Sequence, residues 1–482
     1  MANYRSPGVY TEDIPSLPPS IAEVESAVPA FVGYTEKATV SVTDDAANIP
    51  TPINGLADFV QIFGGAEQED PARISIVVDE LRNSSNVTTG YRVTVTPDFA
   101  NMRKHILYHA VKHYFENGGG RCYIVSVGKY AAAVARPAIE AGLDLIALED
   151  APTILLVPDA IFLSQGDFDT VNQKMINQAA TLRDRFAVID TRTSTVPKTT
   201  TSITTDVTTA IGSIPADILI RQFGAVYYPW LETTYNYAFD FPNLALTTHT
   251  VNGAAPAAGD DKTGSTMTQL QATASSMYNA INAIYGSYYI KLPPSAAIAG
   301  VYARTDRTRG VWKAPANAGL LSVVKPTVNV SRSDQDLLNI NTDTGKSVNA
   351  IINVAGYGPV VMGARTLDGN DNEWKYINVR RFFNVVEESI KKSSNWVVFE
   401  PNVAATWVKL QAMIENYLTE KWRDGALAGA KPEQAFFVNI GLGKTMTSID
   451  ILEGRLIVEI GMAVSRPAEF IILRFIQMMQ TS

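Results

Sequence analysis

Hydrophobic and polar positions follow two different periods along the middle of this chain, and they predict alternating strands and helices. Short runs rich in β-branched and aromatic residues predict buried strands at 121–127, 153–158 and 186–190. Helical stretches lie between and around these strands, notably at 171–185. Because strand and helix alternate, we expect a mixed α/β (α+β) fold with some parallel strand pairing.

Two amphipathic helices stand out from this pattern. The first is predicted over 101–116, where Asn101 can cap the start and three glycines at 118–120 end the helix. The second is predicted from about 402 to 424, before Gly425. Its apolar side is lined by Trp407, Leu410, Ile414, Tyr417, Leu418 and Trp422.

The N-terminal segment differs from the middle of the chain. Five prolines before residue 30 exclude a helix there, because proline fixes its own backbone and pushes the preceding residue into an extended shape. Residues 8–12 are compatible with one short strand. This segment is therefore either a disordered tail or an extended arm that docks on something else.

Strand patterns also occur near the other end, at 454–464 and 468–477. The last strand is apolar on both faces, and an unpaired strand of that kind is a site of aggregation. It must therefore join a sheet, either in its own subunit or, by strand donation, in a neighbouring subunit.

Three segments interrupt the α/β pattern. Residues 67–97 contain two short strand-like runs and predict a hairpin. Residues 191–209 are dominated by threonine and serine, and 247–268 are rich in alanine, glycine, threonine and aspartate. We expect the last two to be surface insertions or loops.

Length and charge narrow the class of protein. The chain has 482 residues, which suggests about three domains at roughly 100–200 residues each. A net charge of -8 makes nucleic acid an unfavourable partner, and the single cysteine, Cys122, excludes an internal disulfide. No secretory signal or membrane-spanning run is recognisable, so we expect synthesis and folding in the cytosol without membrane insertion.

A phosphate-binding loop is one candidate for chemistry. Residues 441–445 (GLGKT) resemble the end of that motif, but Val438 occupies the position of its first glycine. A basic turn at 304–310 predicts phosphate contact or, more commonly, an ion-paired turn or an interface. We find no nucleophile elbow and no spacing that supports a catalytic triad with His249, so we expect no enzyme.

A histidine stripe is the other candidate. His105, His109 and His113 recur every four residues on the first amphipathic helix, and imidazoles at that spacing can share a zinc ion. Glu116 is the nearest carboxylate. The alternative is a polar helix face that is solvated or lies in a subunit contact.

A long series of short motifs follows one order along the chain. It opens with YRSPGVYTE at 4–12 and AFVGYT at 30–35, and continues with NGG at 117–119, CY at 122–123 and YYPW at 227–230. It is densest beyond residue 293, with PPS at 293–295, GVYARTD at 300–306, GVWKAPAN at 310–317, GARTL at 363–367, RR at 380–381, ESI at 388–390, FEPN at 399–402, GAL at 425–427 and RPAEF at 466–470. The series resembles the contractile tail sheath family of phage tails, R-type bacteriocins and extracellular contractile injection systems.

This resemblance implies a multidomain sheath subunit. Residues 1–30 would form an extended N-terminal arm, 31–292 an outward-facing α/β part, 293–465 a conserved inner domain facing a tube, and 466–482 a C-terminal strand arm. The family's subunits form stacked hexameric rings around an inner tube, with baseplate and terminal cap proteins as further partners. No cofactor, metal ion or nucleic acid is implied.

The resemblance also suggests which residues make contacts between proteins. The arms are expected to enter neighbouring sheets through Val9, Tyr10, Glu12, Phe470, Ile472, Arg474 and Ile476. Candidates for contact with the inner tube are Lys409, Lys421, Arg423 and Lys431, whose alternative role is that of solvated helix charges. The competing hypothesis is a metal-dependent enzyme or binding module that uses the histidine stripe.

Overall fold

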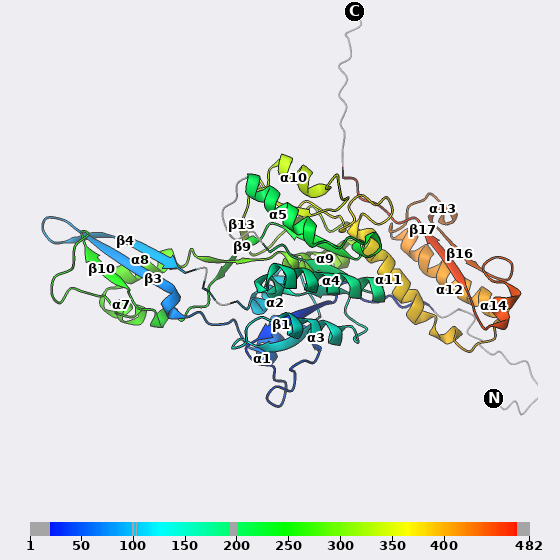
Figure 1. Cartoon of the computed structure of the whole chain (residues 1–482), viewed down its shortest axis with the longest axis horizontal. Coiled ribbons are helices and arrows are strands. Elements are labelled where there is room, and N and C mark those ends of the chain that lie inside the picture. The colour runs from blue at the N-terminus through cyan, green and yellow to red at the C-terminus, as the bar shows by residue number, and fades with distance from the viewer. Residues whose placement is uncertain (1–19, 99–100, 103, 193–199, 470–482) are drawn as a thin grey trace, which may run out of the picture. The chain divides into compact units, whose positions relative to one another are not determined.

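A computed structural model describes residues 20–98, 101–102, 104–192 and 200–469 (Figure 1). These residues divide into two compact units. The large unit comprises residues 25–384 and 466–469, and the small unit comprises residues 20–24 and 385–465. The predicted strand at 8–12 lies outside the described residues, and so does all but the start of the one predicted at 468–477.

A nine-stranded sheet forms the centre of the large unit, in the order β12-β15-β14-β8-β7-β6-β1-β5-β2. The pairs from β5 through β1, β6, β7 and β8 to β14 are parallel, and the pairs at the two ends of the sheet are antiparallel. The strands are β1 (Pro29–Thr35), β2 (Thr51–Ile53), β5 (Cys122–Lys129), β6 (Ile154–Leu156), β7 (Phe186–Ile189), β8 (Gly224–Tyr228), β12 (Ala318–Gly319), β14 (Asn349–Val354) and β15 (Gly358–Val361). The predicted α/β fold with parallel pairing is confirmed.

Helices cover both faces of this sheet, so its strands are buried on both sides. The helices of the large unit's main body are α1 (Leu56–Phe63), α2 (Leu107–Glu116), α3 (Arg136–Ile146), α4 (Gln165–Leu182), α5 (Thr200–Ser213), α6 (Ile218–Arg221), α9 (Ser295–Arg309), α10 (Arg332–Asn339) and the start of α11 (Ile377–Ser393). At the α2–α9 crossing, a Cβ added to Gly300 would lie 2.6 Å from the carbonyl oxygen of Tyr114. The motif glycine is therefore required by close helix packing.

A second module of the large unit has its own hydrophobic core. Its sheet has the order β10-β3-β4, and the core includes Ile76, Val78, Met267 and Ile281. The elements are β3 (Ile74–Arg82), β4 (Thr88–Pro97), β10 (Thr248–Val251), α7 (Met267–Thr273) and α8 (Ser275–Tyr285). Antiparallel pairing of β3 and β4 confirms the hairpin predicted at 67–97. A small sheet of β11 (Tyr289–Leu292), β9 (Leu231–Asn236) and β13 (Val323–Pro326) completes the unit.

Four expectations about elements and boundaries are corrected by the structure. The 247–268 segment is not a loop throughout, because it contains β10, which pairs with β3. The helix expected at 101–116 begins only at Leu107, because the preceding residues pack as irregular chain with Met102 and His105 buried. The 191–209 segment is not a loop throughout: α5 begins at Thr200 and buries Ile203 and Val207 in the main core. The compact units do not divide at residue 293, because β14 continues the same sheet as β8.

The small unit consists of a few helices and two strands. Its elements are the C-terminal part of α11, α12 (Ala404–Arg423), α13 (Pro432–Ala435), β16 (Phe436–Ile440), α14 (Ser448–Leu452) and β17 (Val458–Met462). The predicted helix at 402–424 and the strand at 454–464 are thus confirmed within a few residues. Leu410, Ile414, Tyr417 and Leu418 form the buried face of α12, as the apolar pattern predicted.

Candidate functional site

The small unit contains an antiparallel sheet of only two strands, β16 and β17. Val438 and Ile440 of β16 are buried, while Phe437 points to the opposite face and is 53% exposed. Phe437 pairs with Gly461 across the sheet, and a Cβ added to this glycine would clash with the phenyl ring. The glycine therefore leaves room for an exposed aromatic ring on the sheet face.

This sheet has no third strand among the described residues. A two-stranded sheet is marginally stable by itself, and its outer strands carry backbone groups that can pair with a further strand. The helix α12 packs against this sheet through β16. The two-stranded sheet is the feature of the small unit that points to association.

The first described residues of the chain lie on α11 and α12. The amides of Ala22 and Val24 donate hydrogen bonds to the hydroxyls of Ser393 and Ser389, at 3.2 and 3.0 Å. Between them, Glu23 Oε2 lies 2.6 Å from Lys421 Nζ. Residues 22–24 are therefore bound to the small unit's own helices.

The last described residues are fixed on the large unit. Glu469 accepts hydrogen bonds from Nε and Nη2 of Arg365, which form a two-pronged ion pair with its carboxylate. The Arg365 side chain is 5% exposed and that of Glu469 is 21% exposed. These roles of Arg365 and Glu469 were missed at the sequence level, although both lie in quoted motifs (GARTL and RPAEF).

The seven arm residues expected to contact neighbours lie outside the described residues, so those contacts stay predictions. They are Val9, Tyr10, Glu12, Phe470, Ile472, Arg474 and Ile476.

The four residues expected at an inner tube differ in their surroundings. Lys409, Arg423 and Lys431 are exposed, and Lys409 Nζ lies 6.0 Å from the centre of the Trp396 ring. Lys421 is instead 8% exposed and pairs with Glu23. The helical spacing could have revealed this, because Lys421 follows Tyr417 by four residues and so shares its buried face.

The histidine stripe does not form a shared site. His105 Nδ1 lies 2.7 Å from Glu67 Oε2. Burial lowers the pKa of His105, but the hydrogen bond to Glu67 and the negative charges of Asp159 and Glu67 together outweigh burial and raise it. His113 is fully buried, and burial lowers its pKa to about 4. Both His109 and His113 pack against the ring of Tyr235. Expecting a solvated polar helix face was therefore wrong, because neighbouring elements cover the stripe. The described residues contain no group of three or more His, Cys, Asp or Glu side chains able to hold a metal ion.

The other two candidate motifs have structural roles. In the 441–445 loop, the amides of Lys444, Thr445 and Met446 all donate to the carbonyl oxygen of Gly441, so they do not face a phosphate. Residues 304–309 are not a turn but the last part of α9, where Asp306 accepts two hydrogen bonds from Arg381, and these two side chains are 5% and 3% exposed. The prediction of a turn is therefore wrong, and the prediction of an ion pair is confirmed.

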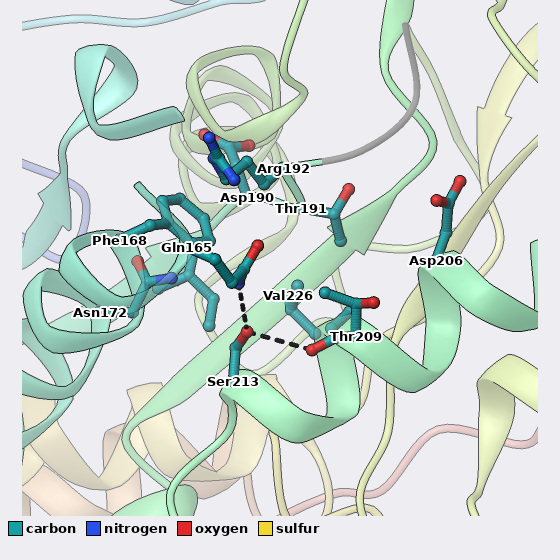
Figure 2. A pocket seen from close by; sticks show the side chains of 12 residues that line it. Gln165, Phe168, Asn172, Asp190, Thr191, Arg192, Asp206, Thr209, Ser213 and Val226 are labelled. Atoms are coloured by element: carbon teal, nitrogen blue, oxygen red, sulfur yellow. Dashed lines mark hydrogen bonds between the residues drawn. The ribbon is translucent and has the colours of Figure 1, made fainter. Parts of the chain in front are cut away.

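Figure 2 shows a small cavity next to the end of β7, between α4 and α5, lined by both polar and apolar side chains. Gln165 donates to Ser213 Oγ at 3.2 Å, and Ser213 donates to the carbonyl oxygen of Thr209 at 3.1 Å. Burial raises the pKa of the neighbouring Asp190 to about 7. The cavity volume is about 10 Å³, which is room for one water molecule.

Among the described residues, no helix combines the length and the apolar composition that a membrane-spanning segment needs.

Comparison with known proteins gives a consistent family. Residues 369–477 match the family model described as the phage tail sheath C-terminal domain. The chain is 32% identical over 154 residues to the tail sheath protein of Enterobacteria phage T4, which covers 30% of this chain and 23% of that protein. The chain thus aligns with about a quarter of the length of this curated relative.

Two solved structures cover the chain almost completely. One is the PVC sheath complex of an extracellular contractile injection system in the contracted state, with 31% identity, 99% of both chains covered and a TM-score of 0.63. The other is the contracted helical sheath of the anti-feeding prophage, with 29% identity, 98% of this chain and 99% of that chain covered and a TM-score of 0.64. The alternative of a metal-dependent enzyme or binding module receives no support from these matches.

Proposed function

This chain belongs to the contractile tail sheath family and is a structural sheath subunit, and from that premise we propose how it assembles and works. Copies of the chain form hexameric rings that stack helically around an inner tube. Assembly takes place in the bacterial cytoplasm, and a baseplate and a terminal cap hold the two ends of the polymer. A head-to-tail contact that does not close on itself produces such a helical polymer.

The two-stranded β16–β17 sheet is the observation that carries this proposal. Residues beyond 469 and before 20 supply strand-forming sequence, and the small unit supplies a sheet to which strands can be added. Backbone hydrogen bonds then give affinity, while alternate side chains fix the register. Each subunit would thus complete its neighbours' sheets with the ends of its own chain.

Contraction follows as a change between two packings of the same subunits. The sheath assembles in an extended state separated by a barrier from a more compact packing, and release at the baseplate allows the subunits to rotate and bury more surface. The shortening sheath drives the tube through a target envelope. Exposed Lys409, Arg423 and Lys431 are the proposed contacts with the tube, because exposed ion pairs contribute little each and can be released.

Truncation after Ser465 tests the proposal. The truncated chain should be soluble and folded but unable to form tubular polymers in negative-stain electron microscopy. A chain that lacks residues 1–19 is the matched variant and should show the same defect. Tubes formed by either truncated chain would contradict strand exchange.

A further inference from the structure

We propose that each end of the chain is held at its root by a glutamate clasp, formed by Lys421, Ser389 and Ser393 for the N-terminal arm and by Arg365 for the C-terminal arm. We call residues 22–24 the root of the N-terminal arm and Glu469 the root of the C-terminal arm. The clasps are positioning devices: they fix the place and direction from which each arm starts. This inference rests on the proposed exchange of arms between subunits.

In the N-terminal clasp, the spacing of alternate residues in an extended chain matches the spacing of residues four apart on a helix. Two residues of extended chain advance about 6.7 Å, and four residues of helix advance about 6 Å. The amides of Ala22 and Val24 can therefore each meet a serine hydroxyl on α11, at Ser393 and Ser389. The Glu23 side chain lies on the opposite side of the extended segment, and its Oε2 lies 2.6 Å from Lys421 Nζ. Three successive residues are thus held by side chains of two helices.

The C-terminal clasp is more deeply buried. Arg365 Nε lies 2.9 Å from Glu469 Oε1, and Nη2 contacts the second carboxylate oxygen. Its remaining nitrogen, Nη1, donates to the carbonyl oxygen of Gly369 at 2.9 Å. The side-chain amide of Asn349 also bonds both backbone groups of Arg365 at 2.8 Å, which holds this residue in place. A two-pronged pair on a fixed arginine restricts direction as well as distance.

The two clasps should differ in strength. The Glu23 side chain is 38% exposed and makes one contact with an ammonium group, whereas the Glu469 side chain is 21% exposed and makes two with a guanidinium group. Salt screens the exposed pair more than the buried one. The N-terminal root should therefore loosen first as salt rises, while the C-terminal root keeps its direction.

Spin labels next to the two glutamates test the clasps in the full-length chain. Cysteines introduced at Ala468 and Ala22, both exposed, carry the label in separate proteins, and Cys122 is buried and does not react in the folded chain. Electron paramagnetic resonance should show immobilised labels in the parent proteins. E469Q should convert at least half of the 468 signal to the mobile form, and E23Q should do the same for the 22 signal. Raising the salt concentration should mobilise the 22 label before the 468 label.

Matched controls separate a clasp from a general effect of lost charge. E373Q in the large unit and E420Q on α12 remove exposed glutamates and should leave both labels immobilised. Circular dichroism checks that each variant is folded. Labels that are as immobile in E469Q and E23Q as in their parents would overturn the clasps.

The outcome for the clasps is distinguishable from the outcome for the proposed function. Label mobility is measured on unassembled subunits, and tube formation is scored separately by microscopy. If the parent chain forms no tubes, the proposed function is wrong while the labels still decide the clasps. If the parent forms tubes and the labels do not respond, the clasps alone are wrong.

Discussion

The two units of this molecule differ in how completely each one buries its sheet. In the large unit, helices cover both faces of a nine-stranded sheet, and residues such as Phe31 and Phe186 are completely buried. In the small unit, one helix covers a two-stranded sheet, and Phe437 stays 53% exposed. A two-stranded sheet is marginally stable by itself, so the β16–β17 sheet, which has no third strand among the described residues and carries an exposed aromatic ring, is suited to completion by other chains.

The largest effect should come from breaking the core of the large unit. Phe186→Ala removes a fully buried ring from β7 and should lower the free energy of unfolding by about 3–5 kcal/mol. Urea unfolding, followed by tryptophan fluorescence, measures this loss. A change below about 1 kcal/mol would contradict the claim that the large unit depends on its own core.

Acid should weaken the large unit through a buried histidine. The folded pKa of His113 is about 4, below the unfolded value of 6.5, so the unfolded chain binds more protons between these pH values. Stability is therefore full above pH 6.5 and falls by about 3 kcal/mol as the pH drops to 4. In His113→Gln this part of the pH dependence should be absent, as measured by urea unfolding at several pH values.

The sequence provides an internal control for this acid response. All four histidines lie at or before residue 249, so the small unit has none. A spectroscopic probe in the small unit should show no stability change that depends on His113. An equal pH slope in the parent and in His113→Gln would contradict the assignment.

The smallest effect on stability should come from Phe437→Ala in the small unit. The ring is half exposed, so its loss should change the free energy of unfolding by no more than about 0.5 kcal/mol. Tube formation should nevertheless decrease, because the ring is a cross-strand neighbour for any added strand. Leu452→Ala, which truncates an 87% exposed side chain on α14, is the control and should leave assembly unchanged. Equal losses of unfolding free energy in Phe437→Ala and Phe186→Ala would remove the distinction between the units.

Local patterns predicted the elements well where a pattern repeats. The 402–424 helix and the 67–97 hairpin are confirmed, because a period of 3.6 or 2 residues belongs to the segment itself. The prediction failed at 191–209, where threonine and serine suggested a loop. Ile203 and Val207 make α5 a core helix, and only packing in the main core and against α10 compensates for the weak helix formers around them.

What the sequence alone determined is the family and the order of the elements, since ordered motifs and hydrophobic periods are written along the chain. Only the tertiary structure shows which charged side chains form ion pairs. Lys421 and Glu23 are 398 residues apart, and Arg365 and Glu469 are 104 residues apart. Ion pairs of this kind carry no local signal, because their partners are brought together only when the burial of apolar surface has fixed the paths of distant segments.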